Sequence, residues 1–178
     1  MSRRVVIRAP VAGDEAEFLA ACQRSRKLHS PWVSTVKTPA EFRAWLGRMV
    51  APANYPLLIC RADTGEIVGV VNVSNIVRGL FHSAYLGYYV FAGHEGQGLM
   101  REGLQAVMRH AFKTLKLHRL EANIQPGNKA SLRLVMACGF AREGYSPRYL
   151  KIGGRWRDHE RWAILADAKA STKVRVPK

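Results

Sequence analysis

The hydrophobic spacing of this sequence changes at one glycine, and that change constrains the possible folds more than any other feature. Between residues 57 and 91, three segments rich in valine, isoleucine and tyrosine are separated by turn sequences, which predicts an antiparallel β-meander. After Gly98 the apolar residues recur at helical spacing, at Leu104, Val107, Met108, Ala111, Phe112 and Leu115. A strand, a glycine turn and an amphipathic helix therefore follow one another at the centre of the chain.

Weaker patterns on both sides complete the order of elements. Upstream, residues 3–8 suggest a strand, and helices are expected to begin at Gly13-Asp14 and at Thr38. Their apolar faces hold Phe18, Leu19 and Cys22 in the first helix and Phe42, Trp45, Leu46, Met49 and Val50 in the second. Downstream, a strand at 118–125, a helix at 128–138 and two strands that turn at Gly153-Gly154 are predicted. The order β-α-α-β-β-β-α-β-α-β-β predicts an α+β fold, with a mixed, mostly antiparallel sheet and helices on both faces.

Composition narrows the class of protein. The chain has 178 residues, of which 48% are apolar, so one domain can bury a core large enough to hold a ligand cleft. Its apolar runs are too short for a membrane span or a signal peptide, which predicts a cytoplasmic protein without membrane contact. The three cysteines, Cys22, Cys60 and Cys138, lack CxxC spacing and are expected in the core, so no disulfide and no metal site is predicted.

The formal net charge is +15, which draws a protein toward nucleic acid or another polyanion. Lysine and arginine are scattered along the chain and form no recognisable RNA-binding motif. A solubilising surface and a nucleic-acid footprint therefore both remain open.

The turn between Phe91 and the helix after Gly98 is a candidate phosphate site. N–H groups at a helix start have no partner in the helix, the helix dipole favours an anion, and glycines allow phosphate oxygens to approach the backbone. The dipole contributes only about 0.3–2 kcal/mol, so several N–H hydrogen bonds and burial of the remaining ligand must provide most of the affinity.

Residues 84–104, AYLGYYVFAGHEGQGLMREGL, resemble the coenzyme A-binding segment of the GNAT acetyltransferase superfamily. On that match Glu95 stands where Gln or Arg is usual, Gly98 is the first glycine, and Met100 replaces a second small residue. Because Glu95 adds negative charge near a pyrophosphate, its side chain is expected to point away or to pair with a cation. The resemblance implies an acetyl-CoA site formed by Val90, Phe91, Glu95, Gly96, Gln97, Gly98, Leu99, Met100 and Arg101, together with Asn128 and Ser131.

A second segment, Asn128-Lys129-Ala130-Ser131 before Gly139-Phe140, is similar to a motif of one branch of that superfamily. Asn128 also suits a helix N-cap, and both roles can hold. The resemblance implies that Asn128 contacts the pantetheine arm and that Ser131 can protonate the departing thiolate.

Further stretches resemble the RimJ-type ribosomal-protein-alanine N-acetyltransferases, at residues 69–79, 81–82, 85–88, 143–145 and 154–159. The resemblance implies a GNAT-like domain at 3–166, followed by a basic tail at 167–178. It also implies that an amine attacks the acetyl thioester directly in a ternary complex, while the strand ending at Val90 supplies a backbone N–H for the carbonyl oxygen.

No residue stands out as the general base. Some relatives place a glutamate where this chain holds Asn123 or Leu150. A site without a strong base suits a chain-terminal α-amine, of pKa about 7.7–8.0, better than a lysine of pKa about 10.4, because much more of the α-amine is neutral at pH 7. Glu143, His82 and His159 are candidate bases acting through water, or are structural residues.

Four residues are candidates for contact with the acceptor. Trp32 lies in the connection between the first two helices, where it covers the peptide entrance or anchors that segment. Tyr85 and Tyr88 are assigned to one face of their strand, in the core or lining the acceptor cleft. His82 is assigned to the acceptor side.

The implied acceptor is the N-terminus of a protein, namely a ribosomal protein, with ribosomal RNA or ribosome contact through the basic surface and a monomeric or weakly dimeric state. Two alternatives stay open. An acetyltransferase for a small amine or antibiotic would need an acidic acceptor pocket, and only thirteen Asp and Glu residues are present, without a cluster. A non-catalytic RNA-binding assembly factor could keep the same fold.

Overall fold

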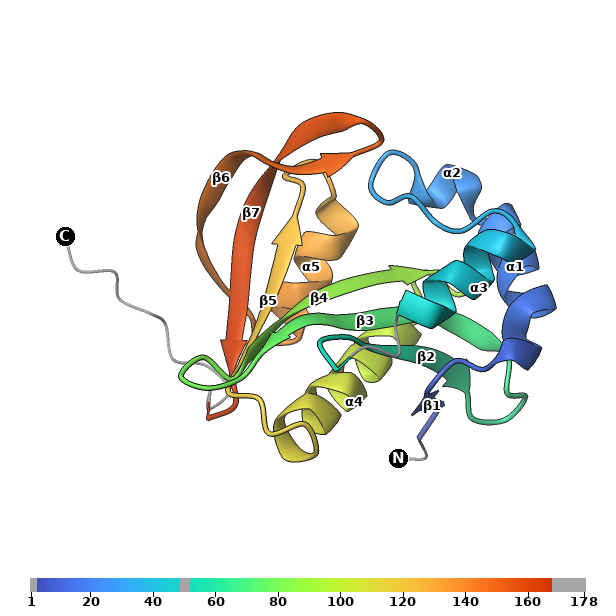
Figure 1. Ribbon diagram of the computed structural model, residues 1–178, viewed down its shortest axis with the longest axis horizontal. Coiled ribbons are helices and arrows are strands. Elements are labelled where there is room, and N and C mark those ends of the chain that lie inside the picture. Colours follow the sequence, from blue (N-terminus) through green and yellow to red (C-terminus); the bar gives the residue numbers. More distant parts are fainter. Residues whose placement is uncertain (1–2, 49–51, 168–178) are drawn as a thin grey trace.

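The computed structural model describes residues 3–48 and 52–167 and contains one sheet in the order β1-β2-β3-β4-β5-β7-β6 (Figure 1). The strands are β1 (Val5–Arg8), β2 (Tyr55–Arg61), β3 (Ile67–Val77), β4 (Ser83–Val90), β5 (Arg119–Ile124), β6 (Ala141–Ile152) and β7 (Arg155–Leu165). Neighbouring strands are antiparallel except β4 and β5, which are parallel. The predicted meander and the mixed, mostly antiparallel sheet are confirmed.

The helices are η1 (Ala12–Asp14), α1 (Glu15–Arg24), α2 (Arg26–His29), α3 (Pro39–Arg48), α4 (Leu99–Lys113) and α5 (Lys129–Ala137). The predicted element order is confirmed, with two additions: the 3-10 turn η1 and the single turn α2. Met49 and Val50, assigned to the face of the second helix, and residues 168–178 of the expected tail lie outside the described residues.

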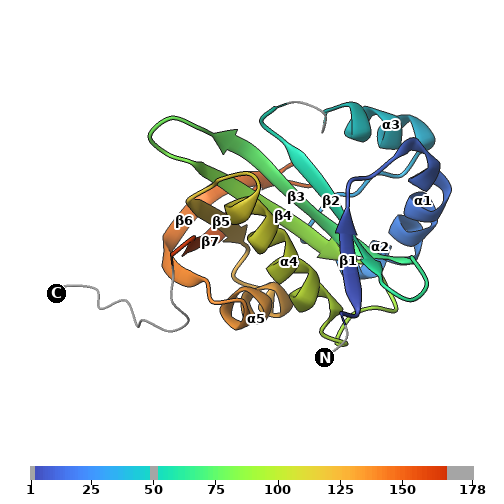
Figure 2. The same cartoon turned by 90° about the horizontal axis from the view of Figure 1, so that it is seen from below.

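Helices cover both faces of the sheet, and each face has its own core (Figures 1 and 2). Leu57 and Ile59 of β2 pack on the side of α4 and α5, whereas Leu58 and Cys60 pack on the side of α1 and α3. Side chains alternate along a strand, so a strand buried on both faces is apolar throughout. Each such side chain contributes about 1.5–3 kcal/mol when fully buried.

The start of α3 follows the predicted capping pattern. The N–H of Glu41 donates to Thr38 Oγ1 over 3.2 Å, and the Glu41 carboxylate accepts from the N–H of Lys37 over 2.6 Å. Two backbone donors at the helix start are thereby satisfied.

The sheet opens between β4 and β5. Their pairing ends at Tyr85 and Glu121, yet β4 stays paired with β3 as far as Val90 and β5 stays paired with β7 as far as Ile124. Residues 86–90 and 122–124 therefore face each other without a ladder between them.

Cys22, Cys60 and Cys138 are buried and free, as predicted for core residues. Within residues 3–48 and 52–167, no helix has the length and apolar character needed to cross a membrane.

Two glycine substitutions test the packing of α4 on β2. A Cβ at Gly103 would lie 2.3 Å from Ile59 Cδ1, whereas a Cβ at Gly47 in α3 would meet nothing within 4 Å. Gly103→Ala is therefore expected to lower the free energy of unfolding by about 1–3 kcal/mol. Gly47→Ala is expected to raise it by about 0.5–1 kcal/mol, because alanine is the better helix former. Denaturant titration measures both values, and equal stability of the two variants would contradict the close contact of α4 with β2.

Candidate active site

A cleft of about 440 Å³ occupies the opening between β4 and β5. One part of its wall comes from the turn before α4 and from α5, including Glu95, Gly96, Gly98, Arg101, Asn128 and Ser131. The other part comes from α2, from the α2–α3 connection and from the β6–β7 hairpin, including Leu28, Trp32, Val33, Leu150, Ile152 and His159. Two different ligands can therefore approach the same gap, one along each part of the wall.

The turn before α4 presents backbone N–H groups to the cleft. Gly98 is the N-cap of α4 with φ of 78°, and no side chain caps this helix. The first bond of the helix runs from Glu102 N–H to Gly98 C=O. Among the described residues, none accepts a hydrogen bond from the N–H groups of Leu99, Met100 or Arg101. Such a helix start, beside the Arg101 side chain, suits a phosphate group.

The same turn is tied to the first strand. The Arg4 guanidinium forms an ion pair with Glu102 and donates to the carbonyl of Gln97 over 3.1 Å. A Cβ at Gly98 would lie 3.3 Å from Arg4 Nη2, so glycine is favoured there by close approach as well as by its positive φ.

Glu95 is held by its own turn. Its carboxylate accepts from the N–H of Gly93 over 2.6 Å, while Gln97 Nε2 donates to the carbonyl of Gly93 over 2.6 Å. Glu95 was expected to point away from the cleft or to pair with a cation; instead its carboxylate is held by a backbone N–H, and Glu95 lines the cleft.

Asn128 and Ser131 meet β4 at the start of α5. Asn128 is the N-cap, and its side-chain oxygen accepts from the N–H of Ser131 over 3.2 Å. The hydroxyls of Ser131 and Tyr88 lie 2.7 Å apart. Burial raises the pKa of Tyr88, so its phenol stays protonated and can donate to Ser131.

The end of β4 directs one peptide group into the gap. The N–H of Phe91 donates to Val68 on β3 over 2.8 Å, so the N–H and C=O of Val90 point to the opposite edge. There the C=O of Val90 accepts from Nε2 of the buried His29 over 2.8 Å. Burial lowers the pKa of His29, which keeps the ring neutral. The sequence offers no signal for His29, because α2 is only one turn long.

His159 lies on the opposite wall, on β7. Its Nδ1 donates to the carbonyl of Arg157 over 2.9 Å, which leaves Nε2 as a proton acceptor. Burial lowers the pKa of His159. Asn123 and Leu150, the positions where some relatives place a glutamate, also line the cleft. His159 is therefore the sequence-predicted base that lies at the gap.

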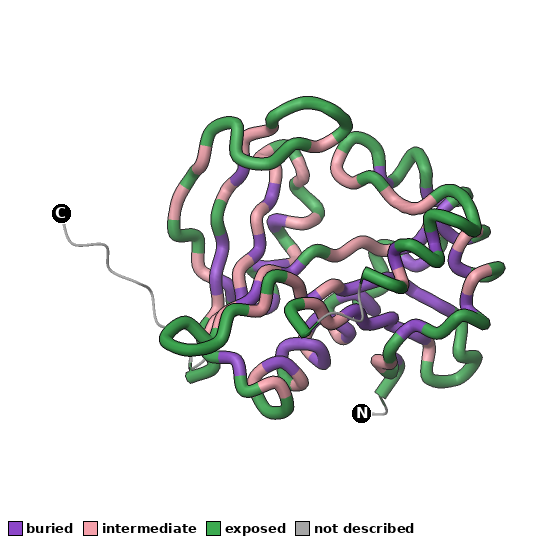
Figure 3. The backbone as a smooth tube through the Cα atoms, in the orientation of Figure 1, coloured by how far each residue is buried: buried purple, intermediate pink, exposed green. Residues whose placement is uncertain are grey.

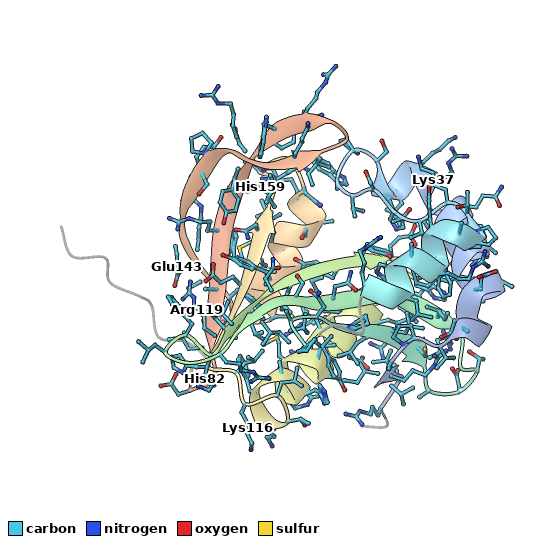
Figure 4. All side chains as sticks on the ribbon, viewed as in Figure 1. Lys37, His82, Lys116, Arg119, Glu143 and His159 are labelled. Carbon is cyan, nitrogen blue, oxygen red and sulfur yellow. The ribbon has the colours of Figure 1, made fainter. Side chains whose placement is uncertain are left out.

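Several predicted residues lie elsewhere. Phe91 and Leu99 are buried in the two cores, and Gln97 bonds within its turn. Glu143 forms an ion pair with Arg119, which lowers the pKa of its carboxyl (Figure 4). His82 contacts the carbonyl of Lys116 at the far end of β4. The side chains of these residues do not line the cleft, although the backbone N–H of Leu99 belongs to the unpaired helix start described above.

The assignment of Tyr85 and Tyr88 to one face is wrong. Residues three apart on a strand point to opposite faces, because side chains alternate with a period of two. Tyr88 packs with the core beneath α4 and α5 and lines the cleft, while Tyr85 projects from the other face and does not line it.

Comparison with known proteins places this geometry in a family. The profile of the acetyltransferase (GNAT) domain matches residues 4–141. The [Ribosomal protein uS5]-alanine N-acetyltransferase of Escherichia coli (strain K12) is 50% identical over 97 residues, which are 54% of this chain and 50% of that protein. A probable N-acetyltransferase of Bacillus subtilis (strain 168), YjcK, is 37% identical over 66% of this chain and 65% of its own length. The chain thus spans about half to two thirds of the length of these relatives.

Two solved structures are similar over nearly the whole chain. Ribosomal-protein-S5-alanine acetyltransferase from Vibrio fischeri superposes with a TM-score of 0.83 at 27% identity, covering 94% of this chain and 96% of that one. Mycobacterium smegmatis RimJ in complex with CoA-disulfide superposes with a TM-score of 0.85 at 28% identity, covering 92% of this chain and 82% of that one.

The two cleft histidines are expected to carry their protons on different nitrogens. Long-range ¹H–¹⁵N spectra should show the Nε2–H form for His29 and the Nδ1–H form for His159, both with a pKa below about 6.5. Because both pKa values are lower in the folded state, protonation favours unfolding, and the free energy of unfolding should decrease as the pH falls below about 6.5. The same tautomer at both sites would contradict these contacts.

Proposed function

The chain belongs to the GNAT acetyltransferase family, and we propose that it transfers the acetyl group of acetyl-CoA to the N-terminal α-amine of a protein, by direct attack in a ternary complex. The observation that carries this proposal is the cleft through the sheet, whose wall has one part with free helix-start amides and another part that is mainly apolar. The first suits the cofactor, and the second suits the end of a polypeptide.

The residues around the α4 turn fit coenzyme A. The N–H groups of Leu99, Met100 and Arg101 would bind the pyrophosphate, and Gly98 leaves room beside them. Asn128 keeps its side-chain NH₂ group for the pantetheine arm, because only its oxygen is engaged in capping. When bound, acetyl-CoA supplies the activated acetyl group as a thioester.

Four groups of the chain would handle the charges of the reaction. The N–H of Val90 points into the gap and would stabilise negative charge on the acetyl carbonyl oxygen. Ser131 would donate a proton to the departing sulfur and regain one from Tyr88, 2.7 Å away, and Tyr88 would recover its proton from solvent in the cleft. Nε2 of His159 would accept the proton that the amine loses, directly or through water.

The acceptor wall supports a peptide over a polyamine. Among the described residues that line the cleft, Glu95 carries the only carboxylate, and it lies on the cofactor wall. A cationic polyamine would find no opposite charge beside Leu28, Trp32 and Ile152, while an α-amine that is partly neutral at pH 7 needs none. The relatives named for ribosomal-protein alanine support a ribosomal protein with an N-terminal alanine as acceptor.

Acceptor selectivity is testable by thiol release from acetyl-CoA. We expect turnover with an alanine-terminated peptide and a kcat/KM at least about 10-fold lower for spermidine and for an N-blocked peptide with an internal lysine, whose amines are almost fully protonated. Faster turnover of spermidine would favour the small-amine acetyltransferase. Absence of turnover with every amine would favour the non-catalytic assembly factor.

The proposed role of Ser131 as proton donor to the sulfur can be tested separately. Ser131→Ala should lower kcat by about 10- to 100-fold with little change in the KM for acetyl-CoA, because a proton donor is lost and the cofactor amides remain. Tyr88→Phe should give a smaller decrease, since Ser131 keeps its hydroxyl. Ser74→Ala on β3, outside the cleft, is the matched control and should leave kcat unchanged. Equal rates in all three variants would refute the role of Ser131.

A further inference from the structure

The last two strands continue beyond the sheet as a two-stranded ribbon, which we define as residues 145–159. β7 pairs with β5 only from Glu160 onward, whereas β6 and β7 stay paired as far as Ile152 and Arg155. Most residues along the outer half of this hairpin are exposed or only partly buried (Figure 3). Both faces of the ribbon are thus available to a partner.

The ribbon is strongly basic. It contains Arg148, Lys151, Arg155 and Arg157, against one acidic residue, Asp158. The Asp158 carboxylate is already engaged, because it accepts from the Tyr145 hydroxyl and from the N–H of Arg148. In the part of the chain that the structure describes, none of the four cations forms an ion pair. Arg148, Lys151 and Arg155 are also exposed, whereas Arg157 is partly buried, so the first three are free for an anionic partner.

Exposed aromatic rings lie among these cations. Trp156 is 60% exposed and Tyr145 is 46% exposed. Lys151 and Trp156 are direct partners in the ladder, so their side chains project from the same face. A large ring left open beside a free ammonium group is the arrangement on which bases stack while phosphates meet positive charge.

We propose that the ribbon binds an unpaired segment of RNA. Phosphates would pair with Lys151 on the face of Trp156 and with Arg155, whose side chain starts from the opposite face of this narrow ribbon, and a base would stack on Trp156. A single strand fits better than a duplex, because the bases of a duplex are stacked on one another and unavailable to an exposed ring.

The ribbon also borders the cleft, since its Leu150, Ile152 and His159 line the acceptor wall. RNA held there would bring the acceptor of the proposed function to the cleft as part of a ribonucleoprotein particle. The RNA contact itself does not depend on that function.

Fluorescence anisotropy with a labelled single-stranded RNA of about 12 nucleotides tests the proposal in the full chain. Lys151→Glu with Arg155→Glu should raise Kd at least about 10-fold and reduce the slope of log K against log salt by about 1.4. Trp156→Ala should raise Kd by about 5- to 100-fold at unchanged salt slope.

The matched control is Arg109→Glu with Lys113→Glu on the outer side of α4, which makes the same change in net charge away from the ribbon (Figure 1). Its Kd for RNA should stay within about twofold of the Kd of the unchanged protein, because only the general effect of net charge remains. Thiol release with a short free peptide should be unaffected in both double variants, which shows that they are folded. Equal loss of RNA binding in the two double variants, or equal binding of a poly-glutamate peptide, would overturn the proposal.

Discussion

The early end of the β4–β5 ladder is the constraint on which the rest of the site depends. The two strands pair only as far as Tyr85 and Glu121, and each is then held by its other neighbour, β3 or β7. Backbone groups on the two open edges need other partners, because unpaired buried peptide groups are costly. His29 satisfies the carbonyl of Val90. The N–H of Val90 and the amides at the start of α4 remain available to a ligand that bridges the gap.

The groups that meet at this gap are kept in defined protonation states by burial. Burial lowers the pKa of His29 and His159 and raises that of Tyr88, so two neutral rings and one protonated phenol line the cleft. Hydrogen bonds to backbone carbonyls then fix the tautomer of each histidine. A neutral, mainly apolar acceptor wall matches an amine that is already partly deprotonated in water, which is why the absence of a glutamate at Asn123 is consistent with an α-amine acceptor.

Local patterns in the sequence were enough to predict much of the fold. The helical spacing after Gly98, the capping residues at Thr38 and Glu41 and the turns of the meander each depend on neighbours within a few residues. On the cofactor side of the cleft, Gly98, Asn128 and Ser131 could be singled out for the same reason, because they belong to short motifs. Their roles remain proposals.

Features set by contacts between distant elements could not be predicted in this way. His29 reaches Val90 across 61 positions of the chain, and α2 is too short to have a periodic signal. Glu143 is held outside the cleft by an ion pair with Arg119, which lies on another strand. The wrong face assigned to Tyr85 does not come from a distant contact. The alternation of side chains along β4 is a local rule, and that rule was misapplied to two residues three positions apart.

The central claim is that the amides of the α4 turn hold the pyrophosphate of coenzyme A. Titration of coenzyme A followed through amide resonances tests it directly. The account predicts saturable shifts at Leu99, Met100, Arg101 and Ser131, with an affinity in the range of about 1 μM–1 mM that is typical of enzyme substrates, and no shifts at the tip of the β6–β7 ribbon. Unchanged resonances at Leu99, Met100 and Arg101 at saturating coenzyme A would contradict it.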